Sequence, residues 1–103
     1  MKEKFLVKKL RKKLEGTVGG FWFKSHGGPF QLVGLPDLIG CVEGLFIGIE
    51  VKQLGKLGKV TARQQFVLGL ITKAGGLAFV TDDVLTAVKK VKRWLPGKRK
   101  PSP

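Results

Sequence analysis

The 103-residue sequence is poor in cysteine, acidic residues and long apolar runs, and each shortage excludes a class of protein. Cys41 is the only cysteine, so no disulfide can form within the chain, as is usual for proteins of the reducing cytoplasm. Acidic residues interrupt the apolar stretch over residues 33–51, so we expect no transmembrane helix. The lysine-rich N-terminus has no long apolar run behind it and is not expected to be a secretory signal. A cytoplasmic protein without a membrane segment is the expectation.

The shortage of acids leaves a large positive charge. Seven Asp and Glu stand against twenty Lys and Arg, which gives a formal net charge of +13. Such a protein attracts polyanions, and nucleic acid is the first candidate because neutralising phosphates releases condensed counterions. Acidic membrane surfaces are a weaker candidate. With so few acids, each one inside an apolar segment needs an explanation.

The hydrophobic periodicity predicts alternating helices and strands in a single α/β domain. Expected helices cover residues 2–15 and 61–74, and Asp82 or Asp83 caps a third; expected strands cover residues 21–24, 37–42, 45–52 and 77–80. Cys41 is expected to be a small buried apolar residue. The composition from Pro96 onward predicts a disordered basic tail over residues 96–103, which leaves residues 1–95 as the domain.

One glutamate of the first helix lies on its apolar side. At about 100° per residue, Leu6, Leu10 and Leu14 form a stripe, and Glu3 falls within that stripe. Glu3 is therefore expected to point at the core or at a cleft. The alternative is structural, because helix starts favour acids through the helix dipole.

A hairpin is expected around Glu43-Gly44, and its register places two acids together. With that turn, Asp37 falls directly opposite Glu50, and Lys52 projects from the same face. The opposite face is wholly apolar, and a one-residue slip would mix the two faces. The residues expected on the apolar face are Leu38, Val42, Leu45, Ile47, Ile49 and Val51.

Two directly opposed carboxylates have Cβ atoms roughly 5 Å apart and repel each other unless a cation lies between them. Mg²⁺ prefers oxygen ligands and keeps several waters, so Asp37 and Glu50 suit it together with phosphate oxygens. Lys52 can then stabilise the charge that develops on a phosphate, or help to orient the attacking water. The simpler alternatives are that Asp37 caps a turn after Pro36, and that Glu50 and Lys52 belong to a solvated strand face.

Gln64 shares its side of the second expected helix with Val67, Leu68 and Ile71. Facing a cleft, its amide can hold a water or a phosphate oxygen. Thr61-x-x-Gln64 also has the pattern of a capping box, in which the same amide serves the helix start. The two roles can coexist.

The ordered set Gly34-Leu35-Pro36-Asp37-Leu38, Ile49-Glu50-Val51-Lys52 and Gln64 resembles the PD-(D/E)XK nucleases. More narrowly, it resembles the VRR-NUC family in its short stand-alone bacteriophage form, from Glu3 to about Val88. The resemblance implies a restriction-endonuclease-like αβββαβ core with a mixed sheet flanked by helices, and dependence on Mg²⁺ or Mn²⁺. By matching position, Asp37, Glu50 and Glu3 would be metal ligands, Lys52 the catalytic lysine and Gln64 the motif glutamine. One departure is Ala62, where the family often has proline.

The expected function is a Mg²⁺- or Mn²⁺-dependent DNA endonuclease with no organic cofactor. The resemblance further implies branched DNA such as Holliday junctions as substrate, and a homodimer, since two cuts need two sites. Additional DNA contacts are expected from Lys24, His26, Lys56, Lys59 and Arg63.

Two other functions remain open. A non-catalytic basic nucleic-acid-binding or architectural protein suits the charge equally well, but it leaves the opposed acids Asp37 and Glu50 unexplained. A basic RNA-binding protein is disfavoured, because no paired aromatic platform is predicted on the sheet.

Overall fold

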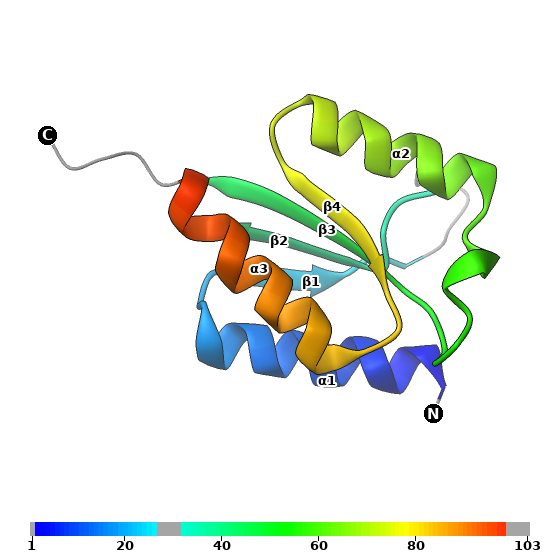
Figure 1. Cartoon of the computed structure of the whole chain (residues 1–103), viewed down its shortest axis with the longest axis horizontal. Coiled ribbons are helices and arrows are strands. Elements are labelled where there is room, and N and C mark those ends of the chain that lie inside the picture. Colours follow the sequence, from blue (N-terminus) through cyan, green and yellow to red (C-terminus); the bar gives the residue numbers. More distant parts are fainter. Residues whose placement is uncertain (1, 27–31, 99–103) are drawn as a thin grey trace, which may run out of the picture.

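The computed structural model describes residues 2–26 and 32–98 and has a single four-stranded sheet with helices on both faces (Figure 1). The elements in chain order are α1 (Glu3–Thr17), β1 (Phe21–Lys24), β2 (Leu38–Val42), β3 (Leu45–Val51), the 3₁₀ turn η1 (Leu57–Lys59), α2 (Ala62–Lys73), β4 (Leu77–Thr81) and α3 (Val84–Lys98). The expected αβββαβ order is confirmed, and α3 follows it. Within the described ranges, no helix is long and apolar enough to cross a membrane.

The sheet is mixed, as expected, with strand order β1-β2-β3-β4. The first three strands are antiparallel, and β4 runs parallel to β3. Val42 pairs with Leu45, so the predicted Glu43-Gly44 turn and its register are confirmed. Both turn residues have positive φ, 52° for Glu43 and 81° for Gly44, which is the backbone that two-residue hairpin turns require.

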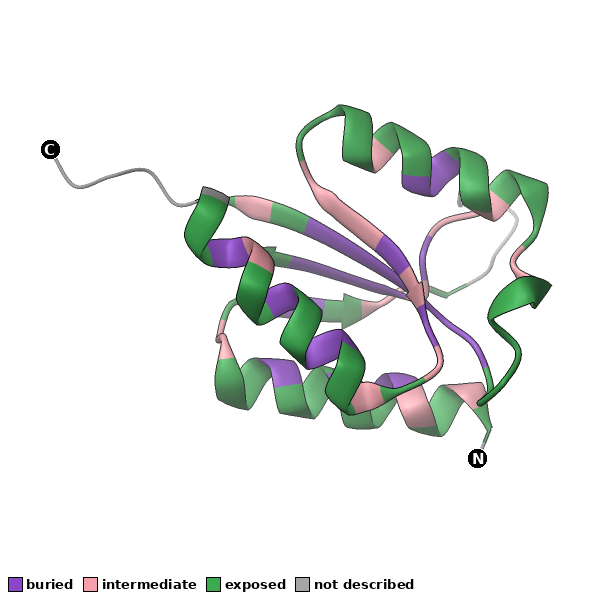
Figure 2. Cartoon of the chain, viewed as in Figure 1, coloured by how far each residue is buried: buried purple, intermediate pink, exposed green. Residues whose placement is uncertain are grey.

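The two faces of the hairpin separate as predicted. The apolar face packs under α1 and α3 and forms the core, and Figure 2 shows the buried residues as purple lengths of the strands and purple segments of these helices. Its buried residues include Leu38, Val42, Ile47, Ile49 and Val51 from the hairpin and Val7, Leu10, Leu14, Val91 and Leu95 from the two helices. On the other face, α2 packs on β3 and β4. The predicted site therefore lies on the α2 face, with the core behind it.

Two predictions are wrong. The chain does not become irregular at Pro96, because α3 continues through it to Lys98. Leu95 is buried with Val91 in the core, and this packing stabilises the last turn, where proline removes only one backbone donor near the helix end. Residues 99–103 of the expected tail lie outside the described residues. Cys41 is exposed rather than buried, because it lies on the α2 face of β2, and α2 packs on β3 and β4 instead.

Candidate active site

The corner before β2 brings Asp37 to the end of β3. The Asp37 carboxylate accepts a hydrogen bond from the backbone N–H of Val51 through Oδ2, at 2.8 Å. Ser25, directly after β1, fixes the other side of the corner. Its backbone N–H donates to the Asp37 carbonyl at 2.8 Å, and its Oγ donates to the Pro36 carbonyl at 2.6 Å. The β3 backbone thus holds the Asp37 side chain, and Ser25 holds the main chain of the Pro36-Asp37 corner.

Glu50 lies in β3 and is only 2% exposed. Its Oε2 accepts from Lys52 Nζ at 3.1 Å and from Gln64 Nε2 at 2.9 Å. Its Oε1 is buried and has no hydrogen-bond partner among the described residues. A buried carboxylate oxygen without a donor is costly unless a proton or a cation occupies its lone pairs.

The electrostatics agree with this geometry. Burial, and after it the nearby negative charge of Asp37, raise the pKa of Glu50 from 4.5 to about 7, while Lys52 opposes the rise. The site therefore holds two acids and one ammonium, and one of the acids, Glu50, is buried. A divalent cation bound between the acids would lower this pKa, because it favours the charged carboxylates.

Gln64 joins the helix start to the acid pair. Its backbone N–H donates to Thr61 Oγ1 at 3.1 Å, and its Oε1 accepts from the Thr61 N–H at 2.9 Å, so the predicted capping box is present. The same Oε1 also accepts from Lys52 Nζ at 3.3 Å, while Nε2 donates to Glu50. The capping role of Gln64 is confirmed, and the same amide also contacts two side chains of the site. That it holds a water or a phosphate oxygen stays a prediction.

The remaining predicted ligand, Glu3, is half-buried in the first turn of α1. Among the described residues, no three His, Cys, Asp or Glu side chains form a group that could hold a metal. Glu3 is therefore not brought together with Asp37 and Glu50 in this structure. The acids that meet are the two that the hairpin register predicts.

The five residues expected to contact DNA lie at several places around the site. His26 is exposed directly after Ser25, and Lys56 and Lys59 are exposed beside and within η1. Lys24 is half-buried at the end of β1 and lines a hollow against α1. Arg63 is partly engaged within the protein, because its Nε donates to the Val33 carbonyl at 3.1 Å. That bond ties the segment before β2 to α2.

Sequence reasoning missed two features. Ser25 holds the Pro36-Asp37 corner, and extending the β1–β2 pairing by one residue would have placed it there. The second is an aromatic pair on the sheet: the exposed Phe21 and Phe23 have ring centroids 5.8 Å apart. The argument against RNA binding, that the sheet has no paired aromatics, is therefore wrong as stated.

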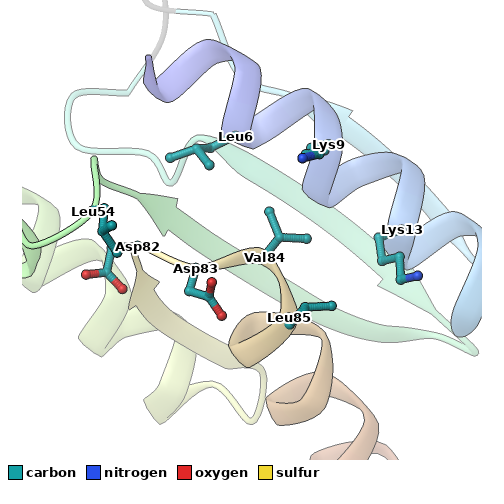
Figure 3. A pocket seen from close by; sticks show the side chains of 8 residues that line it. All are labelled: Leu6, Lys9, Lys13, Leu54, Asp82, Asp83, Val84 and Leu85. Atoms are coloured by element: carbon teal, nitrogen blue, oxygen red, sulfur yellow. The ribbon is translucent and has the colours of Figure 1, made fainter. Parts of the chain in front are cut away.

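A cavity of about 510 Å³ lies away from these residues, between α1 and the start of α3 (Figure 3). Lys9 and Lys13 line it from α1, and Asp82 and Asp83 line it from the β4–α3 connection. Both aspartates already accept hydrogen bonds from backbone N–H groups. Asp82 accepts from the Gly55 N–H, and Asp83 accepts from the N–H and hydroxyl of Thr86 at the start of α3. These contacts account for the acids structurally.

The sequence and the fold were compared with those of known proteins. No protein-family model and no curated protein matches the sequence. A solved structure of a VRR_NUC domain protein superposes with a TM-score of 0.75, covering 93% of this chain and 89% of that chain at 16% sequence identity. The chain has the VRR_NUC fold. The fold expected from the motif residues is thereby confirmed, although the two sequences have diverged widely. In this VRR_NUC fold, Asp37, Glu50, Lys52 and Gln64 form the connected group described above.

Proposed function

We propose that this protein is a metal-dependent DNA endonuclease of the VRR-NUC family, and that Asp37, Glu50 and Lys52 form its active centre. The observation that carries the proposal is the buried Glu50 Oε1, which lacks a donor and lies beside a second carboxylate. A purely structural acid pair would be destabilising, since like charges at opposed strand positions repel. A site for a cation explains why both acids are present.

The donor set fits Mg²⁺ or Mn²⁺. Asp37 and Glu50 would hold the ion, because both offer carboxylate oxygens, and Mg²⁺ needs only one or two protein carboxylates when waters and phosphate oxygens complete its shell. When bound, such an ion polarises a phosphate and lowers the pKa of a water that can attack it. Glu3 is not needed for this set.

The neighbouring side chains of this chain have separate tasks. Lys52 is fixed by Glu50 Oε2 and Gln64 Oε1, so its ammonium is already oriented and can stabilise the negative charge that develops on the scissile phosphate. Gln64 is a positioning residue, since it holds Glu50 and Lys52 from the first turn of α2. The +13 charge supplies the general attraction to the DNA backbone.

We further propose branched DNA as substrate and a two-fold homodimer as the active form. One chain carries one such site, and a four-way junction needs two cuts. The uncovered part of the α2 face suits a second copy. Phe21, Phe23 and Phe46 are 67%, 42% and 45% exposed there. The strand residues paired beside these rings are the uncharged Ile39, Cys41 and Gly48. The three exposed rings amount to roughly 300 Å², about the size of the apolar patches that mark interaction sites.

The dimer is tested by light scattering with and without junction DNA. Phe46→Glu should give a monomer, because it would bury two carboxylates at the two-fold interface. Leu85→Glu, at an apolar position on α3 that is 60% exposed, is the matched control and should leave the dimer intact. A wild type that is monomeric with and without DNA removes this part of the proposal.

The catalytic proposal is tested with labelled forks, flaps, nicks and four-way junctions incubated with each metal. Asp37→Asn should abolish cleavage and keep or strengthen binding. Its amide oxygen can still accept from the Val51 N–H, so the fold should persist. Glu15→Gln, which alters the charge equally at an exposed position of α1, should cleave like the wild type.

The opposite outcome is equally well defined. If the wild type leaves branched, single-stranded and duplex DNA uncut with Mg²⁺ and with Mn²⁺, the non-catalytic DNA-binding alternative holds. If Asp37→Asn cleaves as fast as the wild type, the assignment of the acids is wrong.

A further inference from the structure

Phe5 is a large apolar side chain in an unexpected place. It lies in α1 nearly opposite Val7, Leu10 and Leu14, the residues of that helix that enter the core, and it is 53% exposed. Single exposed apolar residues are common and by themselves need no explanation. What distinguishes Phe5 is the charge around it.

Basic side chains surround the ring on both sides. One hollow, of about 380 Å³, is lined by Phe5 with Lys8, Lys9 and Lys12. A second, of about 370 Å³, is lined by Phe5 with Val7 and four cations, which are Lys4, Lys8, Arg11 and Lys24. The Lys4 ammonium lies 5.5 Å from the ring centroid. Among the described residues, Arg11 is the one cation of this group that forms an ion pair, with the exposed Glu15 at 3.5 Å.

We propose that this surface binds an unpaired stretch of DNA, with a base stacked on Phe5 and the adjoining phosphates contacted by Lys4, Lys8 and Lys12. Proteins bind single strands by combining a basic groove with aromatic rings on which bases stack. A base pair inside a duplex has no free face to offer, so the ring favours an unpaired nucleotide over blunt duplex.

The position of the Phe5 surface relative to the active centre indicates which class of DNA substrate the protein would take. Lys24, which lines the second hollow, precedes Ser25, whose N–H binds the Asp37 carbonyl. A strand that lies along α1 would pass beside this corner, and it would reach the acid pair around the end of the sheet, because α1 and the site lie on opposite faces. The substrate would be branched DNA with an unpaired arm, such as a fork or a flap. This step rests on the proposed function, whereas single-strand binding at Phe5 does not.

The sheet aromatics make an instructive contrast. Phe21 and Phe23 are also exposed, but their strand partners Cys41 and Ile39 carry no charge. An apolar surface without cations suits a protein partner, and an aromatic ring among cations suits a polyanion with stacking faces. Because Phe23 belongs to the proposed dimer surface, the control for Phe5 is Leu85, an exposed apolar residue on α3.

The test measures binding by fluorescence anisotropy in EDTA, so that no cleavage is needed. The probes are a labelled oligothymidine and a blunt hairpin duplex. Phe5→Ala should weaken oligothymidine binding by about 5- to 150-fold, the range expected for one lost base stack, and leave duplex binding unchanged. Phe5→Trp should restore single-strand binding. Leu85→Ala should match the wild type.

The salt dependence of oligothymidine binding distinguishes the contribution of the Phe5 ring from that of the lysines. Phe5→Ala should leave the slope of log affinity against log salt unchanged, whereas Lys12→Gln should reduce it by about 0.7, the value for one single-strand phosphate contact. Equal losses for oligothymidine and duplex, or wild-type oligothymidine binding by Phe5→Ala, would overturn the inference. So would Phe5-dependent binding to phosphatidylserine vesicles without any effect on DNA, which would assign the surface to membranes.

Failure of this inference is distinguishable from failure of the nuclease proposal. A protein that cleaves forks but binds oligothymidine equally well with and without Phe5 loses only the single-strand site. A protein that loses oligothymidine binding in Phe5→Ala but cleaves no DNA keeps that site and loses the nuclease.

Discussion

Replacing Glu50 with Gln tests the electrostatics of the acid pair while nearly preserving its shape. In the folded protein, burial and the charge of Asp37 raise the pKa of Glu50 to about 7, against an ordinary value of 4.5. Folding therefore takes up a proton between these two pH values, because the folded state binds it more tightly. The corresponding stability is fully present below the lower value and is lost as the pH rises through the upper one.

The size of the effect follows from the two pKa values. Their difference, from 4.5 to about 7, corresponds to about 3 kcal/mol at about 1.4 kcal/mol per pKa unit. The free energy of unfolding of the wild type, measured by urea titration in EDTA, should fall by that amount between about pH 5 and about pH 8. Glu50→Gln should remove the fall. Its amide oxygen can still accept from Lys52 and Gln64, and its NH₂ can donate to Asp37.

Two controls sharpen the result. Glu15→Gln, at an exposed acid, should keep the wild-type dependence. Adding Mg²⁺ at about pH 8 should restore stability to the wild type and not to Glu50→Gln, because a bound ion stabilises only the state that holds it. The titration of Asp83 does not interfere. Hydrogen bonds from Thr86 lower the pKa of Asp83, so its contribution is lost only as the pH falls below its ordinary range. A wild type with flat stability across this window, or a Glu50→Gln variant with the same fall, refutes the reasoning.

Three further predictions follow from single contacts. Lys52→Met should raise the pKa of Glu50 further, because Lys52 lowers it. The free energy of unfolding in urea should then fall at a higher pH than in the wild type. If it falls at the same pH, the ion pair does not act as argued. Gly40→Ala would place a Cβ in collision with the Trp22 ring, and should lower the free energy of unfolding in urea by about 1–3 kcal/mol. Gly16→Ala, with nothing within 4 Å, should instead stabilise α1 by about 0.5–1 kcal/mol, and equal effects of the two changes would disprove the packing argument. Thr61→Ala should lower the free energy of unfolding by about 1 kcal/mol, because the Gln64 N–H loses its cap; calorimetry measures this change. Thr72→Ala is the control and should cost less, because the Thr72 hydroxyl donates only to a carbonyl of its own helix.

The hairpin was predictable because two independent patterns select the same register. The turn residues Glu43-Gly44 set the pairing, and only that pairing keeps one face wholly apolar. The meeting of Asp37 with Glu50 follows from strand alternation alone. Gln64 was placed on the inner side of α2 by the same kind of argument, from the helical period.

The periodicity could not show how far each face is covered. It assigns a residue to one side of a strand, but the width of the covering layer depends on where α2 lies, which is a tertiary property. Cys41 and Phe21 are exposed for this reason. Pro96 was misread in a related way, since local propensity ends the helix there and the burial of Leu95 continues it. For Glu3, a helical wheel gives a direction from the axis and no distance to the acids of the hairpin.

The short connection between the two acids has a consequence for folding kinetics. Asp37 and Glu50 flank one hairpin with a two-residue turn, so closing that loop costs little entropy and can happen early. The carboxylates then meet before α2 brings Gln64 to them. Their repulsion acts on the forming hairpin, and metal-free refolding should slow as rising pH removes the proton from Glu50.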